Sequence, residues 1–372
     1  MNGEFNGAEL RLARIFNELA LEDVASRVDK TRQYLHKLET GQATPTTQLI
    51  GHLASALQVE PAFFSNGPTI MTGEDQFHFR KLFTTRAMIK QVAMARGELI
   101  GRLVIYLDQE LRLPEHRIPV VVDPQTTEDI ERAAELCRRE WELGLGPIAN
   151  MHRLAEYVGA VVTSFHSISK EIDALSVALK RPIIVRNEAK ESVCRQRFDI
   201  GHELGHFVLH TAQTTGDRVT ESQANRFASA LLIPRTMMAK LFPRPRGSRL
   251  DWSGLRDFKL TWKVSKAAIL YRARQLELIS DSQYKTGVIT LRRTGEAVRE
   301  HEDHLIAPES PELLSRSLKV LAEKKGVHTA EIASALRVTP LLLQKIIGFD
   351  IRIPTPALGQ RIVQRPRLHL VT

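Results

Sequence analysis

The sequence predicts a multidomain protein with an all-α N-terminal domain, a central α+β domain and an all-α C-terminal region. The chain has 372 residues, roughly two to three times the length of an average domain. Short segments with helical periodicity fill its beginning and return toward its end, whereas the middle mixes helices with short β-rich runs. With 43% hydrophobic and 26% charged residues, the composition excludes disordered, fibrous and disulfide-scaffolded classes.

The overall charge favours an anionic partner. Lysine and arginine number 52 against 43 acidic residues, which gives a net charge of +9 and makes nucleic acid the first candidate. The only cysteines are Cys137 and Cys194, and the N-terminus lacks the apolar core of a secretion signal, so we expect a cytoplasmic protein. No apolar run approaches the roughly 18 residues that span a bilayer, so we expect no membrane segment.

Five short helices are predicted at the N-terminus, at Gly7–Leu19, Glu22–Val28, Thr31–Thr40, Thr47–Val59 and Pro61–Ser65. A helix-turn-helix seats its second helix in the major groove of DNA, so that helix needs one apolar face and one polar, basic face. The third segment has both, because Leu35 and Leu38 point inward. Its expected DNA contacts are the capping Thr31 and the outward residues Arg32, Gln33, His36 and Lys37.

The N-terminal segment resembles the Cro/repressor-type (XRE-family) helix-turn-helix over about residues 7 to 65. The resemblance rests on Asp23-Val24-Ala25, on Thr31 to Gly41 and on Thr44-Pro45-Thr46, with Asp29 and Ala20 departing from the usual turn glycine and Ser/Thr cap. It implies a double-stranded DNA operator as partner. Because one recognition helix reads one half-site, we expect a homodimer on a two-fold operator. The alternative is a module used only for dimerisation or protein contacts.

The rest of the chain divides by its turn and proline signals. A polar stretch at Asn66–Asp75 marks a boundary, and a long helix is predicted from Arg86 to Leu113. Strands are expected at Ala160–Ser164 and Pro182–Val185, and later helices at Trp252–Trp262, Ser265–Leu276, Pro311–Lys324 and Thr329–Gly348. We assign a helix-turn-helix domain to 1–66, a linker to 67–95, the central domain to 96–245, a helical extension to 246–304, a helix-turn-helix-like unit to 305–350 and a basic tail to 351–372.

The two ends of the chain contain a repeat. Asp23–Val28 aligns with Glu331–Leu336, and without a gap this alignment brings Thr31 onto Thr339 and Leu35 onto Leu343. Both segments therefore fit a helix-turn-helix, in which a small residue in the first helix permits close approach and apolar residues of the second seal the corner. For the C-terminal copy, a small helical bundle that does not contact DNA is an equal alternative.

The segment His202-Glu203-Leu204-Gly205-His206 is an HExxH motif. Its histidines lie one helical turn apart and can bind one Zn²⁺, while Glu203 can accept a proton from water at the metal. A third ligand is required, and Glu221 is the best candidate because it continues the apolar stripe of Ala224, Ala228 and Leu231. A buried carboxylate is costly unless it is paired or bound to metal, so the alternative is an ordinary buried salt bridge.

These residues resemble the ImmA/IrrE family of zinc metallopeptidases from about Arg153 to Pro234. The resemblance rests on two coupled motifs, Arg197-Phe198 through His202–His206 to His210, and Glu221 through Ala224-Asn225 to Pro234. It implies a zincin-like metallopeptidase domain with Zn²⁺ as cofactor, in which His202, His206 and Glu221 are the metal ligands and Glu203 is the catalytic base.

Together these features predict a DNA-binding transcriptional regulator joined to a zinc-dependent endopeptidase. Its substrate is expected to be a regulatory protein, a repressor-like partner or the chain itself, in a stress or mobile-element response. The alternative is a non-catalytic transcription factor or antitoxin-like regulator whose zinc site is structural or sensory. Among other candidates, we interpret His210 as structural or as orienting a ligand, His301 and His304 as a solvated connection, and Cys194 as a buried thiol.

Overall fold

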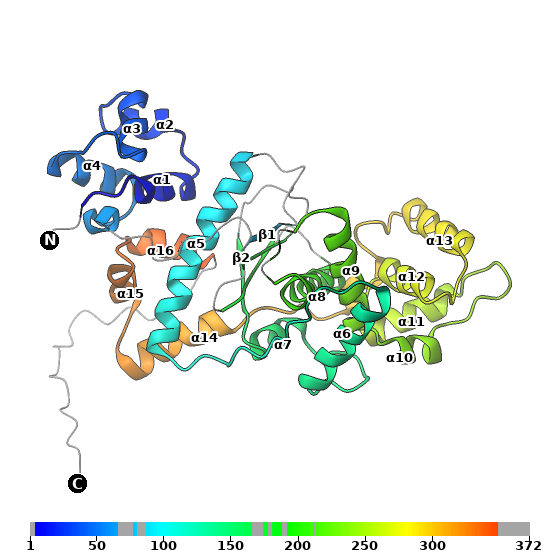
Figure 1. The fold of residues 1–372 in the computed structure, drawn as a ribbon. Helices are drawn as coiled ribbons and strands as arrows, with labels where there is room; N and C mark the ends of the chain where they lie inside the picture. The colour runs from blue at the N-terminus through cyan, green and yellow to red at the C-terminus, as the bar shows by residue number, and fades with distance from the viewer. Residues whose placement is uncertain are drawn as a thin grey trace, which may run out of the picture.

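The computed structural model describes residues 4–65, 77–79, 87–165, 174–177, 181–187, 192–211, 213 and 215–348. The expected boundary at Asn66–Asp75 and the basic tail at 351–372 lie outside these residues. None of the described helices is both long and apolar enough to cross a membrane. Figure 1 shows the N-terminal helices at one side, the sheet in the middle and a group of late helices at the other side.

The N-terminal domain consists of α1 (Gly7–Phe16), α2 (Leu21–Arg27), α3 (Arg32–Glu39), α4 (Thr47–Leu57) and the 3₁₀ helix η1 (Pro61–Ser65). All five predicted helices are confirmed. Polar caps fix their starts, since Asn6, Thr31 and Thr46 each accept a hydrogen bond from a backbone N–H of the first turn. At the turn between α2 and α3, Asp29 takes a left-handed conformation with φ 52°, which aspartate tolerates better than most residues.

The central region begins with β1 (Phe77–Phe79) and contains α5 (Ala87–Glu110), α6 (Thr127–Glu140), α7 (Met151–Tyr157), β2 (Val161–Phe165), β3 (Ala174–Val177), β4 (Ile183–Asn187), α8 (Val193–Leu209), α9 (Arg218–Leu232) and α10 (Arg235–Leu241). The predicted long helix and both predicted strands are present, whereas β1 and β3 were not predicted. The sequence assigned residues 67–95 to a linker, but α5 begins at Ala87, so the last residues of that range are helical.

The four strands form one sheet in the order β1-β3-β4-β2. Strand β2 is parallel to β4, whereas β3 is antiparallel to both of its neighbours. Side chains alternate between the two faces. Val161 and Ile183 face the core that contains α5, and Val162 and Ile184 face the core that contains α7 and α8. The sheet therefore separates two hydrophobic cores.

The C-terminal region contains α11 (Trp252–Trp262), α12 (Lys266–Gln275), α13 (Asp281–Arg293), η3 (His301–Leu305), α14 (Leu313–Val320), η4 (Leu321–Lys325), α15 (Thr329–Ala335) and α16 (Pro340–Ile347). Helix α13 was not predicted. Helices α11 to α13 share their core with α8 and α9, and Arg272 of α12 forms a buried bidentate ion pair with Glu131 of α6. These helices are thus packed into the central domain rather than forming a separate extension.

The N-terminal domain is held against the rest of the chain by helix α5. Arg102 of α5 donates two hydrogen bonds to the buried Glu9 of α1, at 2.7 and 2.8 Å. Helices α15 and α16 belong to the same core as the N-terminal domain and α5, and Figure 1 shows them between that domain and the sheet. The two ends of the chain therefore meet in one hydrophobic core.

Candidate metal centre

The metal-site residues are carried by α8 and α9, which pack closely. A Cβ at Gly205 of α8 would lie 3.0 Å from a ring carbon of Phe227 and 3.3 Å from the backbone of Ala224, so any larger residue there would require α9 to shift by a few tenths of an ångström. Asp217 fixes the start of α9 by accepting hydrogen bonds from Val219 N and Thr220 N, at 2.7 and 3.1 Å. Glu221 consequently lies in the first turn of α9, opposite the middle of α8.

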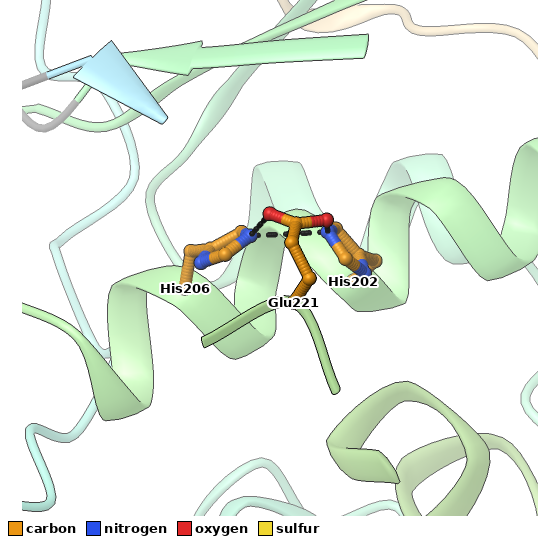
Figure 2. A group of neighbouring side chains, drawn as sticks. All are labelled: His202, His206 and Glu221. Atoms are coloured by element: carbon orange, nitrogen blue, oxygen red, sulfur yellow. Dashed lines mark hydrogen bonds and ion pairs between the residues drawn. The ribbon is translucent and has the colours of Figure 1, made fainter. Parts of the chain in front are cut away.

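His202, His206 and Glu221 meet at one point. The two histidine Nε2 atoms are 3.0 Å apart, and the Glu221 carboxylate oxygens lie 3.4 Å from His202 Nε2 and 3.3 Å from His206 Nε2. Figure 2 shows the carboxylate between the two imidazole rings. Among the described residues, this is the one group of three or more histidine, cysteine or acidic side chains whose ligand atoms all lie close together, within 4.8 Å.

Hydrogen bonds behind the two rings orient their Nε2 atoms toward Glu221. His202 Nδ1 lies 3.0 Å from the Asn225 side-chain oxygen, which accepts a hydrogen bond and so assigns the ring proton to Nδ1. His206 Nδ1 lies 3.0 Å from His210 Nδ1, and His210 Nε2 lies 2.8 Å from the Gln223 side-chain oxygen. Burial lowers the pKa of His210, so we assign it as neutral, with Nδ1 accepting from His206.

The donor set fits a divalent cation. With both Nδ1 atoms protonated, the Nε2 lone pairs of His202 and His206 point at the carboxylate of Glu221. The Oε1 atom of this carboxylate is buried and has no hydrogen-bond partner. Burial raises the pKa of Glu221, but the two facing histidines outweigh it and hold the pKa well below its usual range when their Nε2 atoms are protonated. A cation bound at the Nε2 lone pairs would take the place of those protons and keep the carboxylate ionised. Two imidazoles and one carboxylate are a ligand set of catalytic zinc sites, which leave a fourth position open.

Glu203 follows His202 in α8 and is held from the side of the sheet. It is buried, and its carboxylate accepts a hydrogen bond from Ser176 Oγ of β3. The outer edge of β3 is paired with β1, in which His78 is the residue opposite Ser176. Strand β3 therefore connects the position of Glu203 to β1, which lies within the residues 67–95 that the sequence assigned to a linker.

The structure brings together the three residues that the sequence predicted as ligands, and it buries Glu203, the neighbour of His202 in α8, against Ser176. Asn225 and Gln223 were given no role from sequence, although Asn225 follows Glu221 by one helical turn on the same face of α9. Ser176 had no sequence signal, because β3 is short and was not predicted. His210 contacts His206, so of its two interpretations the geometry favours the ligand-orienting one.

The other candidates do not add to the site. The Cys194 thiol is buried and its pKa is raised by burial to about 12, which agrees with the interpretation as an inert thiol. His301 and His304 lie in η3 and are exposed. The acidic residues between them are not solvated, however, because Asp303 pairs with the buried Lys259 at 2.6 Å and Glu302 pairs with Lys266 at 3.0 Å. The expectation of a wholly solvated connection is wrong for these acids.

The predicted DNA contacts lie together on the outer face of α3. Thr31 caps the helix by accepting a hydrogen bond from Tyr34 N at 3.2 Å, and the four outward residues are all exposed: Arg32, Gln33, His36 and Lys37. Leu35 and Leu38 are fully buried beneath them. Arg32 is paired with Glu22 of α2 at 2.8 Å, an exposed ion pair that is worth little and can exchange for another partner.

Comparison with known proteins finds a family match for the central domain and another for the N-terminal domain. Residues 155–274 match the peptidase M78 family model, described as an IrrE N-terminal-like domain, and residues 7–62 match the model of a helix-turn-helix domain. No curated protein matches the sequence.

Among solved structures, similarity is found to the crystal structure of Bacillus thuringiensis PlcR in complex with the peptide PapR7 and DNA, with 12% identity over 89% of this chain and 93% of that chain. Its TM-score of 0.15 is too low to support an argument about fold or function. The chain thus combines an N-terminal helix-turn-helix domain with an IrrE N-terminal-like domain of the peptidase M78 family, as the sequence motifs predicted.

Proposed function

We propose that this chain is a DNA-binding regulator whose central domain is a zinc-dependent endopeptidase that cleaves a regulatory protein. The observation that carries the proposal is the convergence of two oriented imidazoles and a carboxylate, on the helix that also contains Glu203. When bound, Zn²⁺ supplies a Lewis acid that polarises a peptide carbonyl and lowers the pKa of water. His202, His206 and Glu221 would hold it.

The remaining roles belong to residues of the chain. Glu203 is the general base that takes a proton from the attacking water and delivers it to the leaving amine. Ser176 holds the carboxylate of Glu203 in place through its hydroxyl. Asn225 and His210 keep the imidazoles in the tautomer that presents Nε2 to the metal, as partners behind metal ligands do in zinc enzymes.

The N-terminal domain supplies the second activity. The exposed face of α3 carries Arg32 and Gln33, whose side chains suit bidentate recognition of guanine and adenine, and its amino end at Thr31 suits a phosphate. Double-stranded operator DNA is therefore the proposed nucleic-acid partner, bound in the cytoplasm. Two copies are expected on a two-fold operator, because one recognition helix contacts one half-site.

The proposed substrate is a repressor-like protein or another copy of this chain, cleaved in a stress or mobile-element response. The test incubates the zinc-loaded full chain with a proteome-derived peptide library and with repressors encoded beside its gene, and identifies new termini by mass spectrometry. The matched variants are Glu203→Gln and, as a control at an exposed acid, Glu140→Gln. Cleavage by the wild type and the control but not by Glu203→Gln supports the proposal. Equal cleavage by all three contradicts it, and no cleavage by any zinc-loaded protein favours a sensory or structural zinc site.

A further inference from the structure

The C-terminal helices α15 and α16 have the geometry of a helix-turn-helix. They have the same lengths as α2 and α3, at a constant offset in the sequence. The turns also match, since Arg337 has φ 58° where Asp29 has φ 52°, and Thr339 caps α16 as Thr31 caps α3. The repeat predicted from sequence is therefore a repeat of structure.

The same unit does not offer a face for reading DNA. Helix α16 has four buried apolar residues, Leu342, Leu343, Ile346 and Ile347. Its single cation, Lys345, donates hydrogen bonds to side-chain oxygens of Gln58 and Asn17, at 3.0 and 3.4 Å. The polar side of α16 is thus directed at the N-terminal domain.

A second repeat relates this unit to the end of α4. Ala54 to Pro61 and Ala333 to Pro340 are identical at six of eight positions and differ only at Gln58/Arg337 and Glu60/Thr339. Gln58 and Arg337 are both left-handed, with φ 61° and 58°. The residue that follows each of them donates to an alanine carbonyl five positions earlier, Val59 N to Ala54 O at 3.0 Å and Val338 N to Ala333 O at 2.9 Å.

These two matching segments pair with each other through a local two-fold arrangement. Val59 and Val338 form an antiparallel bridge. Glu60 N donates to Arg337 O at 2.9 Å, and Thr339 N donates to Gln58 O at 3.0 Å. Equivalent backbone groups of the two segments thus form the same hydrogen bond in both directions. This is the pattern of an isologous contact between two copies of one surface.

The contact within the chain uses a cationic side chain that a second N-terminal domain would not supply. Opposite Glu60 the C-terminal segment places Arg337, whereas a second N-terminal domain would place Gln58 there. Arg337 also donates a hydrogen bond to Ala62 O at 2.9 Å, and Val59 and Val338 are both buried. Helix α3 lies on the side of the N-terminal domain away from α15 and α16 (Figure 1).

We propose that residues 329–347, the C-terminal unit, occupy the place that a second helix-turn-helix domain would take. There they cover the edge Gln58–Glu60, whose backbone could otherwise pair with the same edge of another chain. The partner that this edge fits is a second copy of the same edge. Two chains pair through Gln58–Glu60 only when the C-terminal unit is displaced. The proposal is independent of any peptidase activity, because it rests on contacts between the two ends of the chain.

Disulfide trapping in the full chain tests this proposal. Val59 and Val338 are a non-hydrogen-bonded antiparallel pair, whose side chains approach closely enough for a disulfide, and the native thiols at Cys137 and Cys194 are buried. Under mild oxidation, Val59→Cys/Val338→Cys is expected to form an internal disulfide and remain monomeric. Val59→Cys alone is expected to remain monomeric without a disulfide. Failure of the internal disulfide to form, or rapid dimer formation by Val59→Cys alone, overturns the proposal.

A second experiment weakens the contacts that hold the C-terminal unit against the N-terminal domain. Arg337→Glu/Lys345→Glu, added to Val59→Cys, removes its charged contacts with the N-terminal domain and is expected to raise the rate of disulfide-linked dimer formation about tenfold or more. Leu341→Glu, at an exposed position of the same unit, is the matched control and should leave the rate unchanged. If circular dichroism shows that the double variant unfolds, Arg337→Gly repeats the test, because glycine keeps the left-handed backbone. A folded release variant that links no faster than the control overturns the proposal.

Discussion

Two glycines of α8 test whether the close approach of α8 and α9 builds the metal centre. Gly201→Ala and Gly205→Ala are the same substitution one helical turn apart, and each gains about 0.5–1 kcal/mol of helix propensity. A Cβ at Gly201 would lie 3.4 Å from Ala228 Cβ, which is an ordinary contact, whereas a Cβ at Gly205 meets Phe227 at 3.0 Å and the backbone of Ala224 at 3.3 Å. Backbone atoms cannot change rotamer, so we expect the added methyl group to shift α8 and α9 apart by a few tenths of an ångström.

The expected difference follows from these contacts. Overpacking of a core costs about 1–3 kcal/mol, and because the propensity gain cancels between the variants, Gly205→Ala should be about 1–3 kcal/mol less stable than Gly201→Ala. Separation of the helices also moves Glu221 away from His202 and His206, so zinc affinity should fall in Gly205→Ala alone.

Urea unfolding followed by tryptophan fluorescence measures this difference, because all three tryptophans lie in or against the core of the central domain. The unfolding is done on metal-free protein, and zinc affinity is measured separately by competition with a chelating dye. Equal unfolding midpoints and equal zinc affinities for the two variants would refute the argument that the contact at Gly205 positions Glu221.

Three further predictions concern other parts of the chain. Asn225→Leu should keep the fold and lower zinc affinity about 10–100-fold, because His202 loses the partner that fixes its tautomer; the dye competition measures it. Burial raises the pKa of Glu156 to about 7, by more than its backbone hydrogen bonds lower it, so stability present below pH 4.5 should be lost as the pH rises through 7, as urea midpoints at pH 5 and 8 would show. Arg32→Ala should cost about 1–3 kcal/mol and relax base preference, whereas Lys37→Ala should weaken all DNA sequences alike and reduce the salt dependence, as gel-shift titrations would measure.

Each of these predictions has an outcome that contradicts it. Unchanged zinc affinity in Asn225→Leu would remove that residue from the metal centre. For the pH effect, Glu156→Gln is the control, and an equal loss of stability from pH 5 to 8 in that variant would exclude Glu156 as its cause. For DNA, deletion of residues 1–66 without any change in affinity or base preference would show that another part of the chain reads the operator.

Local signals explain what could be predicted from the sequence. Thr31 and Thr46 cap α3 and α4 as such residues do in isolated helices, so these helix starts follow from neighbouring residues alone. The three proposed metal ligands could be grouped for a similar reason, since the two histidines share one face of α8 and Glu221 continues the apolar stripe of α9. The helical period carries this information without knowledge of the tertiary structure.

Features that depend on distant contacts were missed. Strand β3 has only four residues and exists through its pairing with β1 and β4, so Ser176 could not be connected with Glu203. Residues 246–304 were assigned to a helical extension, and their packing against the central domain was missed because it depends on distant contacts, such as the buried pair of Arg272 and Glu131, which are 141 positions apart. The pairing of Val59 with Val338 is made by backbone groups, and the similar sequences of the two segments do not by themselves indicate that the segments contact each other.

The central claim is that His202, His206 and Glu221 bind one zinc ion per chain while Glu203 does not ligate it. Elemental analysis of the purified wild type and of His202→Ala, Glu221→Ala and Glu203→Gln tests this claim directly. We predict about one zinc per chain in the wild type and in Glu203→Gln, and loss of most of the zinc in the other two variants. A full complement of zinc in both His202→Ala and Glu221→Ala would contradict the claim and place the metal elsewhere.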